Sequence, residues 1–72
     1  MNSLIDEAEE LRMQLVQVIH KMKVFDEREL SNEFKRITGR ESLGLGRTIR
    51  EFLFDLTQLG VLHYDNFRYR VK

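Results

Sequence analysis

Residues 49–71 carry the pattern that decides the fold, and they read Ile-Arg-Glu-Phe-Leu-Phe-Asp-Leu-Thr-Gln-Leu-Gly-Val-Leu-His-Tyr-Asp-Asn-Phe-Arg-Tyr-Arg-Val. In the first half of this stretch the apolar residues recur every three or four positions, which places them on one side of a helix. Gly60 ends that pattern. After it, apolar and polar residues alternate, which is the period of a β-strand. The stretch therefore predicts a helix followed by a β-hairpin.

The hairpin is expected over about residues 61–71. Asp65 and Asn66 are predicted to form its two-residue turn, because both residue types tolerate the positive φ that a tight turn requires. The face directed at the core is then predicted to carry Leu62, Tyr64, Phe67, Tyr69 and Val71. The opposite face is predicted to carry His63, Arg68, Arg70 and Lys72.

The helix before this hairpin is expected over about residues 45–59. Its core side is predicted to hold Leu45, Ile49, Phe52, Leu53, Leu56 and Leu59. Its opposite side is predicted to hold Arg47, Arg50, Glu51, Phe54 and Gln58. The nearby Gly44 and Gly46 fit neither a phosphate-binding loop nor a dinucleotide fingerprint, because the required lysine and third glycine are replaced by other residues.

A second helix is expected over about residues 27–38. Asp26 and Glu29 have the spacing of a capping box at its start, and Gly39 is expected to cap its end. Residues 24–25 ahead of it are expected to form a short strand. The apolar face of this helix is predicted to carry Leu30, Phe34 and Ile37.

A first helix is expected over about residues 3–23, with a core stripe of Leu4, Ala8, Leu11, Leu15, Val18, Ile19 and Met22. Ile5, Met13 and Val16 fall outside this stripe. Two interpretations are open for them: they widen the core face, or they form a second contact surface that makes a homodimer. Met13 and Val16 are therefore candidates for a protein interface.

The composition is that of a small globular domain. The chain has 72 residues, of which 42% are hydrophobic and 33% charged, so we expect one domain over residues 1–72. No cysteine and two histidines argue against disulfides and against a metal site. No apolar run approaches the ~18 residues of a membrane helix, and the acidic start is unlike a signal peptide. We therefore expect a cytoplasmic, nucleoid or nuclear protein that is not secreted.

The charges are distributed unevenly although they cancel. Twelve basic and twelve acidic residues give a net charge of zero. Residues 1–34 carry a balance of −4, and residues 35–72 carry a balance of +4. This asymmetry favours an anionic partner for the C-terminal half.

The order of helix, strand, helix, helix and hairpin resembles the winged helix-turn-helix superfamily. The resemblance rests on residues 49–71 and on the entry to the second helix, Phe-Asp-Glu-Arg-Glu-Leu, at residues 25–30. It implies an α+β, mostly helical fold of three helices with a C-terminal two-stranded hairpin as the wing. It also implies a small protein that binds double-stranded DNA, acts as a transcriptional regulator and reads the major groove with its third helix. The connection before that helix is longer than in the compact helix-turn-helix.

The resemblance places Arg47, Arg50 and Glu51 at base edges, since arginine donates to guanine and glutamate accepts from cytosine. Phosphate contacts are expected from basic side chains of the wing, the second helix and the connection that follows it. These side chains are Lys35, Arg36, Arg40, Arg68, Arg70 and Lys72.

An alternative is a winged-helix module that binds a protein, as an adaptor or inhibitor of a larger complex, and does not bind DNA. Zero net charge, the acidic first helix and Asp65 at the wing tip favour it. Phe54 is the main interface candidate, because an exposed aromatic residue often marks an interface. Two other interpretations of Phe54 are open: contact with a thymine methyl group, or packing beneath the wing as part of the core. No group of residues has the spacing of a catalytic site. We therefore expect no enzymatic activity and no cofactor.

Overall fold

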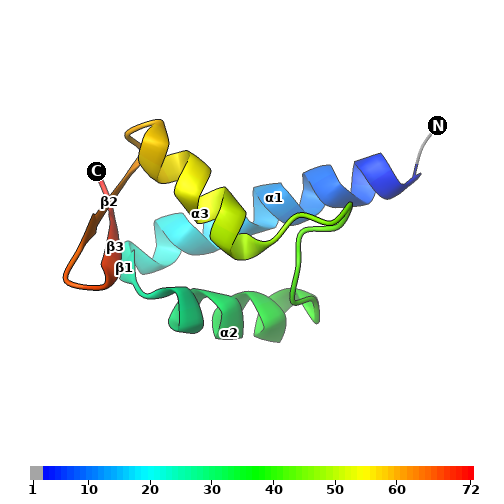
Figure 1. Cartoon of the computed structure of the whole chain (residues 1–72). Helices are drawn as coiled ribbons and strands as arrows, with labels where there is room; N and C mark the ends of the chain where they lie inside the picture. Colours follow the sequence, from blue (N-terminus) through cyan, green and yellow to red (C-terminus); the bar gives the residue numbers. More distant parts are fainter. Residues whose placement is uncertain (1–2) are drawn as a thin grey trace.

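The computed structural model describes residues 3–72, which form three helices and three short strands (Figure 1). The helices are α1 (Ser3–Met22), α2 (Glu27–Thr38) and α3 (Ile49–Gln58). The strands are β1 (Val24–Phe25), β2 (Leu62–Asp65) and β3 (Arg68–Val71). The fold is α+β and mostly helical, as the sequence predicts. No helix within residues 3–72 is long and apolar enough to cross a membrane.

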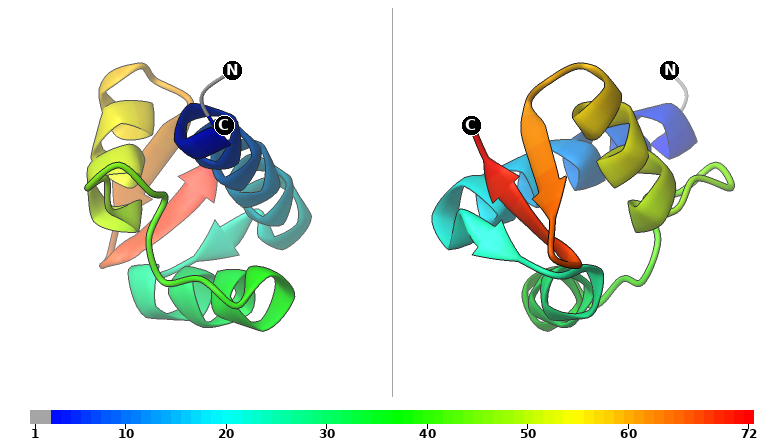
Figure 2. Two further views of the ribbon diagram at one scale, coloured as in Figure 1. Left: turned by 90° about the vertical axis from the view of Figure 1, so that its right-hand side faces the viewer. Right: turned by 60° about the vertical axis from the view of Figure 1, so that its left-hand side comes forward.

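The three strands form one antiparallel sheet in the order β1-β3-β2. The short strand β1 therefore adds to the C-terminal hairpin, with Val24 opposite Arg70. This sheet lies at the C-terminal end of α1, whereas the connection between α2 and α3 lies toward the other end of the molecule (Figure 1). Figure 2 shows the strands side by side, with the chain's C-terminus at the end of β3.

The hairpin turn comes one residue later than predicted. Asn66 and Phe67, and not Asp65 and Asn66, occupy the two turn positions, with φ of 53° and 63°. This register pairs Tyr64 with Tyr69 on the face that packs against the core. Burial of one face fixes the register, because a shift changes which side chains meet there. Phe67 consequently lies in the turn and is 83% exposed, so its expected place on the core face is wrong.

The capping box predicted for α2 is confirmed. The Asp26 carboxylate accepts from the Glu29 backbone N–H at 2.7 Å, and the Glu29 carboxylate accepts from the Asp26 N–H at 2.9 Å. At the other end Gly39 caps the helix with φ of 74°, and its N–H donates to the Lys35 carbonyl. Residues that the sequence identifies thus form hydrogen bonds with free backbone groups at both ends of α2.

The start of α3 is four residues later than predicted, at Ile49. Gly44, Leu45 and Gly46 have φ of 80°, 53° and 75°, and such left-handed residues cannot continue a right-handed helix. The helix therefore begins after these residues, with Thr48 as its N-terminal cap. Leu45 is consequently 59% exposed and does not join the core.

The core is formed by all three helices, β1, β2 and the α2–α3 connection. Its buried cluster consists of Leu11, Leu15, Val18, Ile19, Phe25, Leu30, Phe34, Leu43, Ile49, Leu53 and Leu62. No polar side chain is buried among residues whose exposure is described. Two further predictions about the core are wrong: Ile37 is exposed on α2, and Leu59 is 76% exposed because α3 ends just before it.

Candidate nucleic-acid interface

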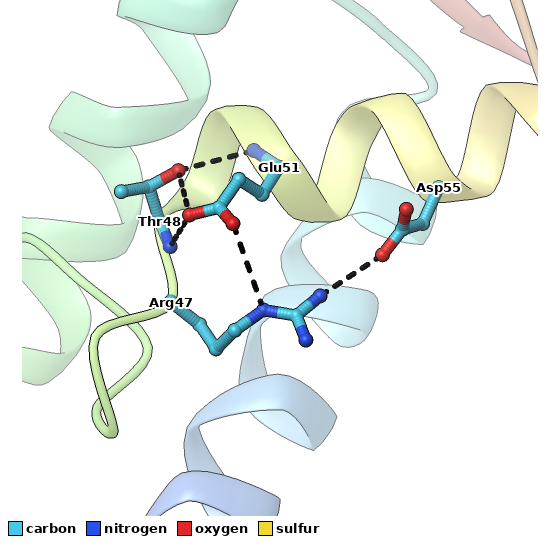
Figure 3. A network of polar contacts seen from close by, with 4 residues as sticks. All are labelled: Arg47, Thr48, Glu51 and Asp55. Atoms are coloured by element: carbon cyan, nitrogen blue, oxygen red, sulfur yellow. Dashed lines mark hydrogen bonds and ion pairs between the residues drawn. The ribbon is translucent and has the colours of Figure 1, made fainter.

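Arg47, a predicted base-contacting residue, lies just before the Thr48 cap of α3 and is paired with the helix itself (Figure 3). Its Nη2 lies 3.0 Å from Asp55 Oδ2, and its Nε lies 4.0 Å from Glu51 Oε2. The guanidinium thus spans two carboxylates one turn apart. A base that accepted from the Nη2 hydrogen now bonded to Asp55 would have to displace that carboxylate, whereas the Nη1 hydrogens form no hydrogen bond within residues 3–72.

Glu51, predicted to accept from cytosine, closes the N-terminal cap of α3. Its Oε1 accepts from the Thr48 backbone N–H at 3.1 Å and from the Thr48 hydroxyl at 3.0 Å. The Thr48 hydroxyl oxygen accepts in return from the Glu51 N–H at 3.1 Å. This reciprocal arrangement is a capping box, and it occupies the carboxylate at the helix start.

Arg50 joins α3 to the start of α2. Its Nε donates to Glu27 Oε1 at 2.9 Å, and its Nη2 donates to Glu27 Oε2 at 3.1 Å, a bidentate pair. These hydrogen bonds, and then the carboxylate charge, raise the pKa of Arg50 above its usual value. The Arg50 side chain is 80% exposed, so the pair adds little stability and is easily broken.

Four of the six predicted phosphate contacts are also paired with carboxylates. Lys35 lies 2.7 Å from Glu41, and Arg68 lies 2.9 Å from Glu29. The hydrogen bond between Lys35 and Glu41, followed by their charges, raises the pKa of the lysine and lowers that of the glutamate. The remaining two pairs are Arg36 with Glu33 and Arg40 with Glu7.

Carboxylates outnumber cations on the surface around the start of α3. We call it the α3–wing face; it comprises the first turn of α2, the exposed side of α3 and the hairpin tip. Its carboxylates are Asp26, Glu27, Glu29, Glu51, Asp55 and Asp65. Its cations are Arg28, Arg47, Arg50 and Arg68. Six carboxylates and four arginines give a net charge of −2, which repels phosphate.

Six cations form no ion pair within residues 3–72: Arg12, Lys21, Lys23, Arg28, Arg70 and Lys72. Arg12 lines a groove on α1 and Arg28 lies at the start of α2. The other four belong to the end of α1 and to β3 with the residues next to them, and we call them the basic sheet face. Arg70 stands in the middle of a cross-strand row, with Val24 on one side and His63 on the other. The Lys23 carbonyl accepts from the Val71 N–H at 2.9 Å, so the end of α1 lies against β3.

Aromatic side chains border a hollow between the hairpin and α3, at the edge of the α3–wing face. Tyr64, Phe67 and Tyr69 line it together with residues of the α2 start and Arg50. Tyr69 stacks on buried Phe25, with ring centroids 5.8 Å apart, and burial raises the pKa of its hydroxyl. Sequence reasoning missed Phe67 at this surface, because only the correct hairpin register moves it into the turn.

The three predicted interface residues fall on two surfaces. Met13 and Val16 lie together in a groove between α1 and α3, beside Phe52. Met13 is 64% exposed in this groove. Phe54 is 61% exposed but lies on another side of α3, one turn beyond Arg50.

Within residues 3–72 no group of three histidine, aspartate or glutamate side chains is arranged to hold a metal ion. The polar side-chain contacts described above are thus surface ion pairs and helix caps. Comparisons with protein-family models, with curated proteins and with solved structures found no match.

Proposed function

We propose that the chain is a winged-helix domain that binds double-stranded DNA, and that the basic sheet face supplies its phosphate contacts. The fold assignment is supported by the sheet order β1-β3-β2, in which the strand between α1 and α2 pairs with the C-terminal hairpin. A role in transcriptional regulation is part of the proposal and rests on the resemblance of residues 49–71 to DNA-binding winged helices.

The observation that carries the DNA proposal is the placement of the unpaired cations. Lys23 follows α1 and Arg70 lies on β3, 47 positions later, yet the hydrogen bond from the Val71 N–H to the Lys23 carbonyl brings these two segments together. Lys21 lies two positions before Lys23, and Lys72 follows Val71 directly. Asp65 is the one carboxylate on β2 or β3. Binding to phosphate requires cations that are not already neutralised, because affinity comes from release of the counterions of DNA.

The role of α3 changes in this proposal. If Arg47 and Arg50 contacted bases through the N–H groups now bonded to Asp55 and Glu27, those carboxylates would face the DNA unpaired. The energy gained at the base edge is offset by that repulsion. We therefore assign phosphate binding to the basic sheet face and only a minor share of the affinity to α3. The domain is expected to bind with little sequence preference.

The test is fluorescence anisotropy of a labelled duplex with two matched double variants. Arg70→Ala with Lys72→Ala should weaken binding by about tenfold or more at low salt. Arg47→Ala with Arg50→Ala removes the same number of charges and should leave affinity within about threefold. The opposite ranking of the two variants would refute the assignment.

A second candidate function, binding of a protein partner, is favoured by the α3–wing face. This face combines a net charge of −2 with two exposed phenylalanines, Phe54 and Phe67. Such a surface fits an apolar pocket rimmed by lysine and arginine. A photo-crosslinking residue at position 54 should then capture a partner in cells of the source organism, whereas the same residue at Arg36 should not. Capture that persists after Phe67→Ser would count against this surface.

A further inference from the structure

One side of α1 bears a stripe of three apolar and two polar residues that lies outside the buried core cluster. Ile5, Glu9, Met13, Val16 and His20 follow one another at spacings of four, four, three and four, which places them on one helix face. Ile5 and Met13 are exposed, and Val16 is half-buried. Glu9, Arg12, Met13, Val16 and Gln17 line the groove that Phe52 completes from α3.

We propose that this stripe binds the same stripe of a second copy of the chain. The two α1 helices run antiparallel about a two-fold axis that passes between Gln14 and Leu15. In this register Met13 packs against the partner's Val16, and by symmetry Val16 packs against the partner's Met13. Arg12 lies beside the partner's Gln17, and Glu9 lies opposite the partner's His20. Every α1 residue of the groove thus has a complementary residue across the interface.

Charge selects the antiparallel direction. In a parallel pair each Glu9 would face the partner's Glu9, and like charges in contact are unfavourable. In the antiparallel pair Glu9 accepts a hydrogen bond from an imidazole N–H of the partner's His20. The antiparallel arrangement also places the N-terminal end of each α1 dipole beside the C-terminal end of the other, which is favourable. A self-complementary surface of this kind produces a closed dimer.

The dimer leaves the basic sheet face open. Lys21 follows His20 by one position on α1 and so points about 100° away from the stripe. Of the remaining cations of that face, Lys23 lies between α1 and β1, Arg70 lies on β3 and Lys72 follows β3. Dimerisation and DNA binding therefore use different surfaces, and either proposal can fail without the other.

The test is sedimentation equilibrium of the full chain without DNA, over a range of concentrations. The wild type should approach twice the monomer mass of 8.7 kDa as concentration rises. Met13→Glu should raise the dimer dissociation constant by about a hundredfold, since a charge would be buried against the partner's Val16. Phe54→Glu is the matched control, because the two side chains are similarly exposed, and it should leave dimerisation unchanged. A wild type that stays monomeric throughout would overturn the proposal.

A charge reversal tests the register itself. Glu9→Lys alone should weaken the dimer by about tenfold, and His20→Glu alone should also weaken it. The two changes together restore opposite charges at both ends of the stripe, and the dissociation constant should return to within about threefold of the wild type. A double variant at least as weak as either single variant would contradict the antiparallel register. Circular dichroism checks that each variant is folded, and the four substituted positions, Glu9, Met13, His20 and Phe54, are all exposed.

Discussion

Replacing Phe67 by glycine should stabilise the isolated domain, because this phenylalanine occupies a backbone conformation that suits glycine. Its φ is 63°, in the second position of a two-residue turn where glycine is strongly preferred. A residue with a side chain at positive φ costs about 1 kcal/mol or more relative to glycine.

Burial of the Phe67 side chain offsets little of this conformational cost. Phe67 is 83% exposed, so less than a fifth of its surface is buried. Full burial of a phenylalanine is worth about 1.5–3 kcal/mol, so the burial lost in Phe67→Gly is about 0.3–0.5 kcal/mol. The net gain in the free energy of unfolding is therefore about 0.5–1 kcal/mol. For a domain of this size the gain raises Tm by about 2–8 °C.

Urea unfolding followed by circular dichroism measures this difference directly. Asn66→Gly is the matched control: Asn66 has a similar φ of 53°, but asparagine tolerates it, so its replacement should change stability by only a few tenths of a kcal/mol. A loss of more than about 0.5 kcal/mol in Phe67→Gly would refute the reasoning. It would mean that the Phe67 ring packs on the hollow beside Tyr64 and contributes to the fold.

Three further predictions concern the core, the caps and pH. Leu53→Ala should cost about 2–5 kcal/mol and leave the chain largely unfolded by circular dichroism, because a core of this size supplies only about 3–5 kcal/mol; Leu59→Ala, in an exposed position, should stay folded. Thr48→Ala should lower the free energy of unfolding in urea by about 1 kcal/mol, whereas Thr48→Ser should retain most of it. The raised pKa of Tyr69 means that the stability it contributes is complete below the unfolded pKa near 10 and is lost as pH rises through the folded pKa. Denaturant unfolding at alkaline pH should therefore show a smaller loss in Tyr69→Phe than in the wild type.

Local sequence signals predicted both ends of α2 and the presence of the hairpin, although its turn lies one residue later than predicted. The Asp26 and Glu29 box and the Gly39 cap act within a few residues of one another, so spacing alone is enough to identify them. The start of α3 was missed because Leu45 continues the apolar helical pattern, while the glycines on either side force a left-handed backbone. Periodicity does not detect that conflict.

The charge of the candidate DNA surface could not be predicted from the sequence. Arg50 pairs with Glu27, 23 positions away, and Arg68 pairs with Glu29, 39 positions away. A count of basic residues in the C-terminal half includes these arginines as free cations, although the fold brings carboxylates of the N-terminal half against them. The unpaired cations Lys21 and Lys23 come from the half of the chain that looked acidic.

The salt dependence of DNA binding is the measurement that tests the central claim most directly. Four phosphate contacts from the basic sheet face should give a slope of log affinity against log salt of about −3.6, at about −0.9 for each contact. Arg70→Ala with Lys72→Ala should reduce the slope to about −1.8, and Arg47→Ala with Arg50→Ala should leave it unchanged. Absence of DNA binding at low salt would contradict the account. So would a salt slope that becomes shallower only when Arg47 and Arg50 are replaced.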